Sequence, residues 1–376
     1  MSRDPTGEAG AKPRGLLPGI QLLRGCAAAL VVLAHANGMM GHPPYFGVDP
    51  YQMPDVGGFG VTVFFTISGF IIAIVSLDHA WQPTMTVNEY ARRRFTRIVP
   101  FLWLCTIGYN IFTYIGTREM DWASMLRALV IWPVGELKPN VLWSLRHEFL
   151  FYVLFALTMM GGRRHLGLLV AWFVTPLVLW TVLLPFPYQT TPWHPYNIEL
   201  LKVVFFGSES AANLQLGVGF LLGMLWLKGT KALGEWLPGG LTLCLILSII
   251  GAAIVTYVPF PPGLARTLLW TALAAVIVTT GLVAQGSDSF LRRAGVQLGN
   301  GSFSIYLVHN PILLILLELS KGRTEMMAPM PFLVIFTLVA IAGGMAVHYL
   351  VERPLIAALS GKKRFFLRGI RAKTQP

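Results

Sequence analysis

The chain has 376 residues, of which 55% are hydrophobic and only 12% charged, and its mean hydropathy is +0.62. Because soluble domains carry about 25% charged residues, this composition excludes an ordinary soluble protein and predicts a membrane protein. The formal net charge of +12 would suit a nucleic-acid-binding protein, so the positive residues must be sorted along the chain before that class is weighed.

Long apolar runs separated by short polar segments predict an all-α polytopic membrane protein, a single bundle of about ten transmembrane helices. We expect the spans to be centred on residues 20–40, 57–77, 98–116, 139–161, 166–186, 210–228, 237–258, 264–285, 302–320 and 331–351. The apolar segment 123–134 is short and is broken by "IWPVG", which favours an interfacial or re-entrant piece over a further span. The expected organisation is therefore an N-terminal tail over 1–19, a transmembrane domain over 20–356 and a basic tail over 357–376.

The positive residues are distributed asymmetrically between the two sides of this predicted bundle. Of the 29 Lys and Arg residues, 20 fall in segments on the side of the N-terminus and seven on the opposite side. The positive-inside rule then places both tails in the cytoplasm and the protein in the cell inner (plasma) membrane. The positive net charge mostly reflects this orientation in the membrane. We therefore expect a bilayer, and no nucleic acid, as partner.

The first predicted span contains "LLRGCAAALVVLAHA", in which Arg24 and His35 interrupt an apolar run. Their separation brings them to within about 20° of the same helical face, about 16 Å apart along the axis. Ionisable residues at membrane depth are costly and indicate a functional site. The alternative is that Arg24 extends to the interface and that His35 only packs between helices.

The second span carries "FFTISGF", where Ser68 and Gly69 form a small-residue site. Such a site lets a thioester approach closely, but close packing of two helices would explain it equally well.

The segment "NEYARRRFTRIVP" places Arg92, Arg93, Arg94 and Arg97 just before the third span. If the segment is helical, Arg94 and Arg97 share a face, a spacing that suits phosphate binding by two guanidinium groups. An arginine cluster at a cytoplasmic span end is also the commonest topogenic signal, so both interpretations stay open.

The fourth span carries "LWSLRHEFLFY", in which Ser144, Glu148 and Tyr152 form a polar stripe. A carboxylate at this depth needs a partner, and His35 or Arg146 is the nearest chemical complement. A structural ion pair or an interhelical hydrogen bond would also account for Glu148.

Two motifs near the C-terminus contain further ionisable residues. In "GSFSIYLVHNPILL", His309 has either a relay role or a packing role, and in "HYLVERPL" we expect Glu352 to form a salt bridge with a basic loop. The three cysteines stand isolated in apolar runs, so no disulfide framework and no metal site is expected.

Six stretches in this order resemble the acyltransferase-3 family of integral-membrane O-acyltransferases. They are "RGCAAALVVLAH", "FFTISGF", "RRRFTRIVP", "LWSLRHEFLFY", "SIYLVHNPIL" and "YLVERPL". The resemblance covers residues 20–356, and the opening "IQLLRG" looks more like the exopolysaccharide-modifying branch than the antigen-modifying branch, which usually has an Asp near the position of Gln21.

The resemblance implies a ten-helix bundle that transfers an acyl group from cytoplasmic acyl-CoA to a hydroxyl, commonly on a sugar or polysaccharide. It makes His35 the catalytic histidine, Arg24 its companion near the donor, and Arg94 and Arg97 the pair that binds the CoA phosphates. Glu148 matches the acidic position of the family's fourth-span motif.

We add Arg93 and Ser68 to the expected donor contacts, with acetyl-CoA as the favoured donor. His35 acts in this hypothesis either as a general base or as a transient acyl carrier, with Glu148 orienting or charge-balancing the imidazole. A proton-coupled transporter or flippase of lipid-linked sugars is the alternative function, in which Arg24, His35 and Glu148 would form a proton relay.

Overall fold

The computed structural model describes residues 17–43, 45–47, 51, 53–183, 197–206, 211–229, 240–259, 263–284, 289–322 and 328–359. The two predicted tails lie almost entirely outside these residues. Within them the chain is helical, and the single β-bridge joins Leu77 and Pro83. The predicted all-α class is therefore confirmed.

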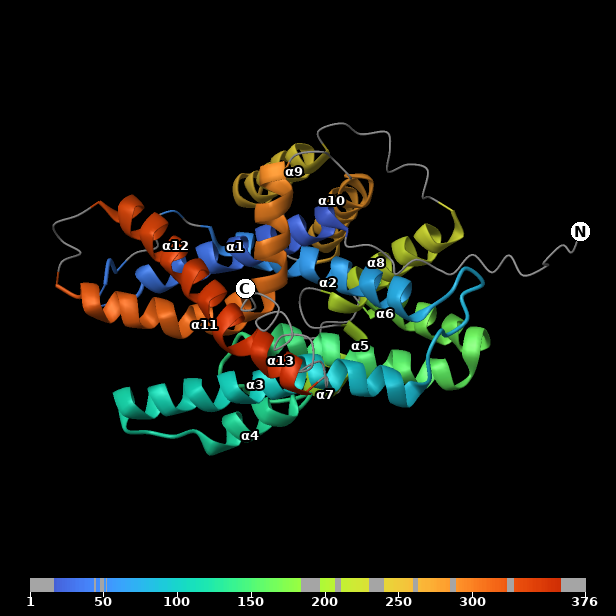
Figure 1. The fold of residues 1–376 in the computed structure, drawn as a ribbon, viewed down its shortest axis with the longest axis horizontal. Coiled ribbons are helices and arrows are strands. Elements are labelled where there is room, and N and C mark those ends of the chain that lie inside the picture. The colour runs from blue at the N-terminus through green and yellow to red at the C-terminus, as the bar shows by residue number, and fades with distance from the viewer. Residues whose placement is uncertain are drawn as a thin grey trace, which may run out of the picture.

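The helices follow one another with short connections (Figure 1). They are α1 (Pro18–Met40), α2 (Pro54–Ser76), α3 (Val87–Thr117), α4 (Trp122–Val130), α5 (Leu142–Met160), α6 (Leu166–Leu183), α7 (Glu199–Leu201), α8 (Ala212–Lys228), α9 (Gly240–Tyr257), α10 (Leu264–Val283), α11 (Ser289–Ser320), α12 (Pro329–Val347) and α13 (Arg353–Leu359). A π-helical turn, His348–Glu352, joins α12 to α13.

Each of the ten predicted spans coincides with a helix. Within the described residues, eight helices are long and apolar enough to cross a membrane. The other two predicted spans are α5, whose mean hydropathy is lowered by Arg146, His147 and Glu148, and α8, which has 17 residues. The segment predicted to be interfacial or re-entrant forms the nine-residue helix α4, which is too short to span a bilayer.

Helices α3 and α11 begin earlier than the predicted spans and are 31 and 32 residues long. The start of α3 is fixed by Thr86, whose hydroxyl accepts a hydrogen bond from the backbone amide of Glu89 at 3.2 Å. Consequently the arginine cluster at residues 92–97 is helical, as its spacing required. We call the end of the bundle at which α1, α3 and α11 begin the basic end.

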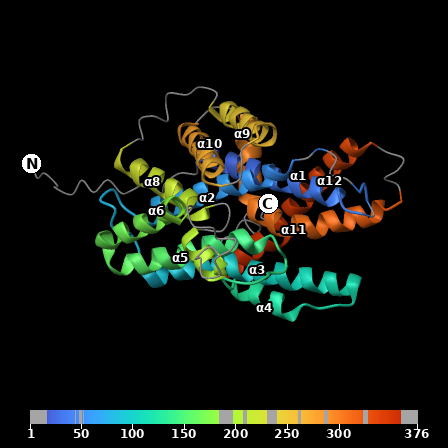
Figure 2. The same ribbon diagram turned by 180° about the vertical axis from the view of Figure 1, so that it is seen from behind.

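The helices α1 and α2 cross the middle of the molecule (Figures 1 and 2). In both views α9 and α10 lie on one side of this pair, and α3 and α4 lie on the other. Phenylalanines of α5, α6 and α8 fill the core between the helices; they include Phe151, Phe155, Phe173 and Phe220. Because of this central position, α1 and α2 can contribute side chains to sites in either half of the bundle.

Glycines allow the central helices to approach closely. A Cβ added to Gly299 of α11 would lie 2.2 Å from the carbonyl oxygen of Gln21 in α1. One added to Gly69 of α2 would lie 1.9 Å from the carbonyl oxygen of Leu216 in α8. Such distances exclude any side chain, so backbone-to-backbone packing sets the position of α1 against α11 and of α2 against α8.

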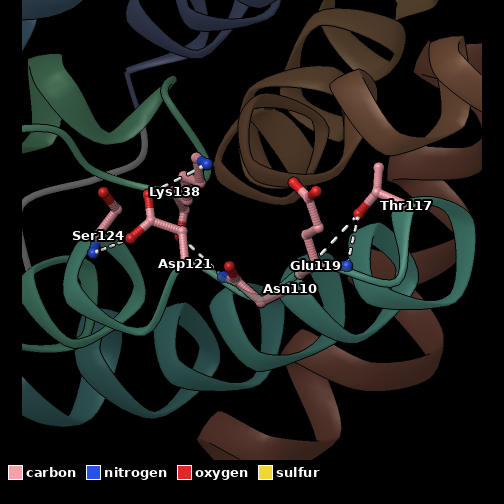
Figure 3. Close-up of polar contacts among 6 residues, drawn as sticks. All are labelled: Asn110, Thr117, Glu119, Asp121, Ser124 and Lys138. Atoms are coloured by element: carbon pink, nitrogen blue, oxygen red, sulfur yellow. Dashed lines mark hydrogen bonds and ion pairs between the residues drawn. The ribbon is translucent and has the colours of Figure 1, made fainter.

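Polar contacts hold the connection from α3 through α4 to α5 (Figure 3). Asp121 caps α4 by accepting from the Ser124 amide at 3.0 Å and lies 3.1 Å from Lys138 Nζ. Asn110 of α3 donates to the Lys138 carbonyl at 3.0 Å. The hydrogen bonds from Ser124 and then the charge of Lys138 lower the pKa of Asp121 to about 2, so this carboxylate stays ionised at neutral pH.

Candidate active site

A cavity of about 400 Å³ opens among α1, α2, α3, α5 and α11 near the basic end. Five of the seven predicted site residues line it, namely Arg24, Ser68, Arg94, Arg97 and Glu148. These residues come from four helices that are far apart in the sequence. The fold therefore brings the predicted donor-binding groups together in one hollow.

Glu148 is held by two hydroxyl groups rather than by either partner expected from the sequence. Its Oε1 accepts from Ser68 Oγ at 2.7 Å and from the hydroxyl of Tyr152. Arg146 instead donates to the Gly135 carbonyl at 2.5 Å, away from the cavity. Among the described residues no hydrogen bond joins Glu148 to His35, whose Nδ1 has a different partner.

Arginine side chains provide the positive charge of the cavity. The guanidinium of Arg94 lies over the rings of Tyr90 and Tyr152, at 5.6 and 5.7 Å from their centroids. Its Nε is buried and has no hydrogen-bond partner among the described residues. Arg24 donates to Gln21 Oε1 at 3.4 Å, and the nearest charges around it belong to Arg97, Glu148 and Glu352. The cavity thus holds guanidinium groups with donors left to bind an anion.

Arg93 lies outside this cavity. It forms an ion pair with Glu89 on the exposed side of α3 and lines a second cavity, which Arg97 also lines. Arg93 and Arg97 therefore both line the second cavity, whereas Arg94 lines only the first.

His35 forms a hydrogen bond with His309 of α11. The Nδ1 of His35 and the Nε2 of His309 are 2.7 Å apart, and the rings are inclined by only 12°. The Nδ1 of the fully buried His309 is 3.1 Å from the Ile305 carbonyl oxygen, which can only accept. In the neutral pair His309 therefore carries its proton on Nδ1, and its Nε2 accepts a proton from Nδ1 of His35. This pattern leaves the lone pair of His35 on Nε2.

Aromatic residues of the cavity lining lie near the histidine pair, although neither histidine is among the lining residues. Tyr306 and Phe64 both line the cavity, and the Tyr306 ring lies 6.0 Å from that of His309. The Tyr306 hydroxyl donates to the Val141 carbonyl at 2.8 Å and accepts from Ser144 at 2.6 Å. Tyr306 thus connects the lining of the arginine-lined cavity to His309, the hydrogen-bond partner of His35.

Glu352 does not pair with a basic loop among the described residues, contrary to the expectation from its position. It is 5% exposed, and its Oε2 accepts from Ser304 at 2.6 Å and lies 2.7 Å from His348 Nδ1. These contacts tie the turn after α12 to α11.

The sequence signal for His309 was its place in "SIYLVHN", but nothing in that stretch reveals which residue it meets. Within the described residues no group of three or more His, Cys, Asp or Glu side chains is placed to hold a metal ion. The arrangement places an imidazole base near a positively charged cavity. These two features suit an acyl transfer from an anionic donor.

Comparison with known proteins shows to which family the chain is similar. The family model described as an acyltransferase domain, of the acyltransferase-3 family, matches residues 17–349. No solved structure matches the chain.

Two curated proteins are similar over most of their length. The chain is 26% identical over 318 residues to the exopolysaccharide production protein ExoZ of Rhizobium meliloti (strain 1021), covering 80% of this chain and 90% of that protein. It is 26% identical over 377 residues to the acyltransferase MdmB of Streptomyces mycarofaciens, covering 93% of each. The match favours an enzyme over the transporter considered above, and the chain belongs to the acyltransferase-3 family of membrane acyltransferases.

Proposed function

We propose that this acyltransferase moves an acyl group, with acetyl the favoured one, from acyl-CoA to a hydroxyl of a sugar or exopolysaccharide. The observation that carries the proposal is the arginine-lined cavity, whose lining includes Tyr306, a ring 6.0 Å from that of His309, the partner of His35. The similarity to ExoZ, an exopolysaccharide production protein, supports an exopolysaccharide acceptor.

The donor enters at the basic end in this proposal. The CoA phosphates bind Arg94 and Arg97, and Arg24 lies deeper along α1. The pantetheine then extends past Ser68 towards Tyr306 and presents the thioester to His35. Glu148, held by Ser68 and Tyr152, balances the positive charge around Arg24 rather than orienting the imidazole.

His35 acts on the acceptor hydroxyl through Nε2. The lone pair takes the hydroxyl proton while the oxygen attacks the thioester carbonyl, the carbon–sulfur bond breaks, and the CoA thiolate recovers a proton from the imidazolium. General-base catalysis of this kind accelerates a reaction by about 10²–10⁴-fold. In the covalent variant of the proposal, Nε2 attacks the carbonyl first, the carbon–sulfur bond breaks and CoA leaves as a thiolate. The acceptor hydroxyl then attacks the acyl-imidazolium, the carbon–nitrogen bond breaks to restore the lone pair on Nε2, and the hydroxyl proton passes to the thiolate.

The test uses the detergent-purified protein, radiolabelled acetyl-CoA and a membrane-glycan extract. We expect wild-type protein to label the glycan, His35→Ala to lose at least about 100-fold of that rate, and Arg94→Ala to require more donor for the same rate. If His35→Ala transfers label as fast as wild type, both variants of the mechanism are wrong. Label that remains on CoA in every sample, with several acyl-CoAs tried, contradicts the proposed reaction itself.

A further inference from the structure

A second cavity of about 620 Å³ lies at the basic end, beyond the site described above. Its walls are formed by the first turns of α3, by the part of α11 around residues 297–300, and by the turn that joins α12 to α13. The residues that matter here are Arg93, Arg97, Asn300, Tyr349, Glu352 and Arg353. Its volume falls within the range of about 300–1,000 Å³ that is typical of cofactor sites.

The two cavities adjoin. Arg97 and Asn300 line both of them, so an extended molecule bound in one can continue into the other. The first cavity includes Tyr306, which lies near His309, and the second is lined by residues of the basic end. Together they form a path with Arg97 at its middle.

The charge of the second cavity is positive and largely unpaired. Within the described part of the chain, neither Arg97 nor Arg353 makes an ion pair, and only Arg93 has one, with the exposed Glu89. The one carboxylate on the cavity wall, Glu352, is occupied by Ser304 and His348. Three guanidinium groups around one hollow are suited to more than one phosphate group.

We propose that the second cavity binds the 3′-phosphorylated adenosine diphosphate portion of CoA, with Arg353 contacting the 3′-phosphate. This inference rests on the proposed function, because it requires an acyl-CoA donor. Arg97 then lies at the diphosphate, where the nucleotide meets the pantetheine. The ring of Tyr349, whose hydroxyl donates to Gln297, offers a surface against which the adenine stacks.

The test compares two donors, acetyl-CoA and acetyl-dephospho-CoA, which differ only in the 3′-phosphate. We expect wild-type protein to have a KM about 10- to 100-fold lower for acetyl-CoA, the value of a hydrogen bond between charged groups. Arg353→Gln should raise the KM for acetyl-CoA to that of acetyl-dephospho-CoA and leave the KM for the second donor unchanged. Turnover of acetyl-dephospho-CoA by the variant shows that it is folded.

The control is Arg292→Gln, which removes an exposed positive charge from the same end of α11 but lines neither cavity. It should keep the wild-type preference between the two donors. Adenosine 3′,5′-bisphosphate should compete with acetyl-CoA in wild-type protein and about 10-fold less well in Arg353→Gln.

Four outcomes are separable. A wild-type protein that uses both donors equally overturns the nucleotide assignment while leaving the acyl transfer intact. An Arg353→Gln variant that keeps the preference for the 3′-phosphate overturns the role assigned to Arg353 and likewise leaves the acyl transfer intact. Absence of transfer from either donor in wild-type protein contradicts the proposed function instead. If vesicles of anionic phospholipid suppress binding of adenosine 3′,5′-bisphosphate to wild-type protein without affecting transfer, the cavity is a lipid-headgroup site and the proposal is wrong.

Discussion

At the scale of single residues, the hydrogen bond between His35 and His309 decides which nitrogen of His35 carries a proton. The Ile305 carbonyl fixes the proton of His309, which in turn fixes that of His35. A neutral imidazole can act as a base only through its unprotonated nitrogen, so His309 is a positioning residue for the proposed catalyst.

Replacing His309 tests this role. The variant His309→Leu removes the acceptor, and we expect kcat to fall about 100-fold while the KM for the donor stays the same. The variant His309→Gln places an amide oxygen where the acceptor nitrogen was, so we expect it to recover most of the lost kcat. The measurement is steady-state transfer of labelled acetyl groups.

The two His309 variants also separate positioning from packing. Both disturb the buried site, and thermal unfolding of each protein in detergent measures how much. If Leu and Gln lower kcat equally at equal stability, the hydrogen bond has no part in catalysis.

Much of the candidate site could be predicted at this scale, and the omissions have a common cause. Arg24 and Glu148 are recognisable because a charged residue in an apolar run needs a reason to be there, and Arg94 is recognisable from its helical spacing with Arg97. Of the two partners of Glu148, Tyr152 belongs to the same polar stripe, but Ser68 is not predictable, because it lies 80 residues away and a serine in a span is unremarkable by itself. The same holds for His309, which is 274 residues from His35.

At the scale of helices, α2 and α8 are held at a distance that leaves no room for a methyl group. Gly69 lies against the backbone of Leu216, and Ser68, the next residue, lines the donor cavity. The sequence left close packing and donor binding as alternatives for this motif. In the structure Gly69 packs against α8, and the neighbouring serine faces the cavity.

Gly69→Ala should therefore separate α2 from α8 and destabilise the protein by about 1–3 kcal/mol. Gly108→Ala is the matched control, since nothing lies within 4 Å of the Cβ that this change adds to α3. We expect the control to be neutral or slightly stabilising. Tryptophan fluorescence during thermal unfolding in detergent measures both, and equal midpoints for the two variants would contradict the packing argument.

The helices themselves were predictable from apolar length, but their ends were not. Hydropathy locates the part of a helix that crosses the bilayer, whereas α3 and α11 continue for further turns outside it. Those turns carry Arg93 and Gln297, which line the second cavity. The sequence places the arginines at the end of a span, but nothing in it indicates that the end of α11 lies beside them.

At the scale of the whole molecule, both cavities lie towards the basic end, which the positive-inside rule predicts to be the cytoplasmic end. Acyl-CoA carries several negative charges and does not cross a bilayer unaided. The proposed orientation therefore matches the side of the membrane on which acyl-CoA is made.

Sealed membrane vesicles of known orientation test this arrangement. Inside-out vesicles should consume acetyl-CoA added to the bath, and right-side-out vesicles should do so only after they are permeabilised. The permeabilised samples provide the control for protein amount. Equal consumption by both intact preparations would show that the proposed orientation is wrong.

The aromatic residues Tyr306 and Phe64 of the cavity lining bear on how fast a bound donor is hydrolysed. A thioester bound beside an exposed base would be hydrolysed by water between productive encounters. Tyr306, held by hydrogen bonds to Val141 and Ser144, lines the cavity, whereas neither His35 nor His309 is among the lining residues. In the proposed mechanism the base therefore stands apart from the bound thioester, and we expect slow hydrolysis of acetyl-CoA when the acceptor is absent.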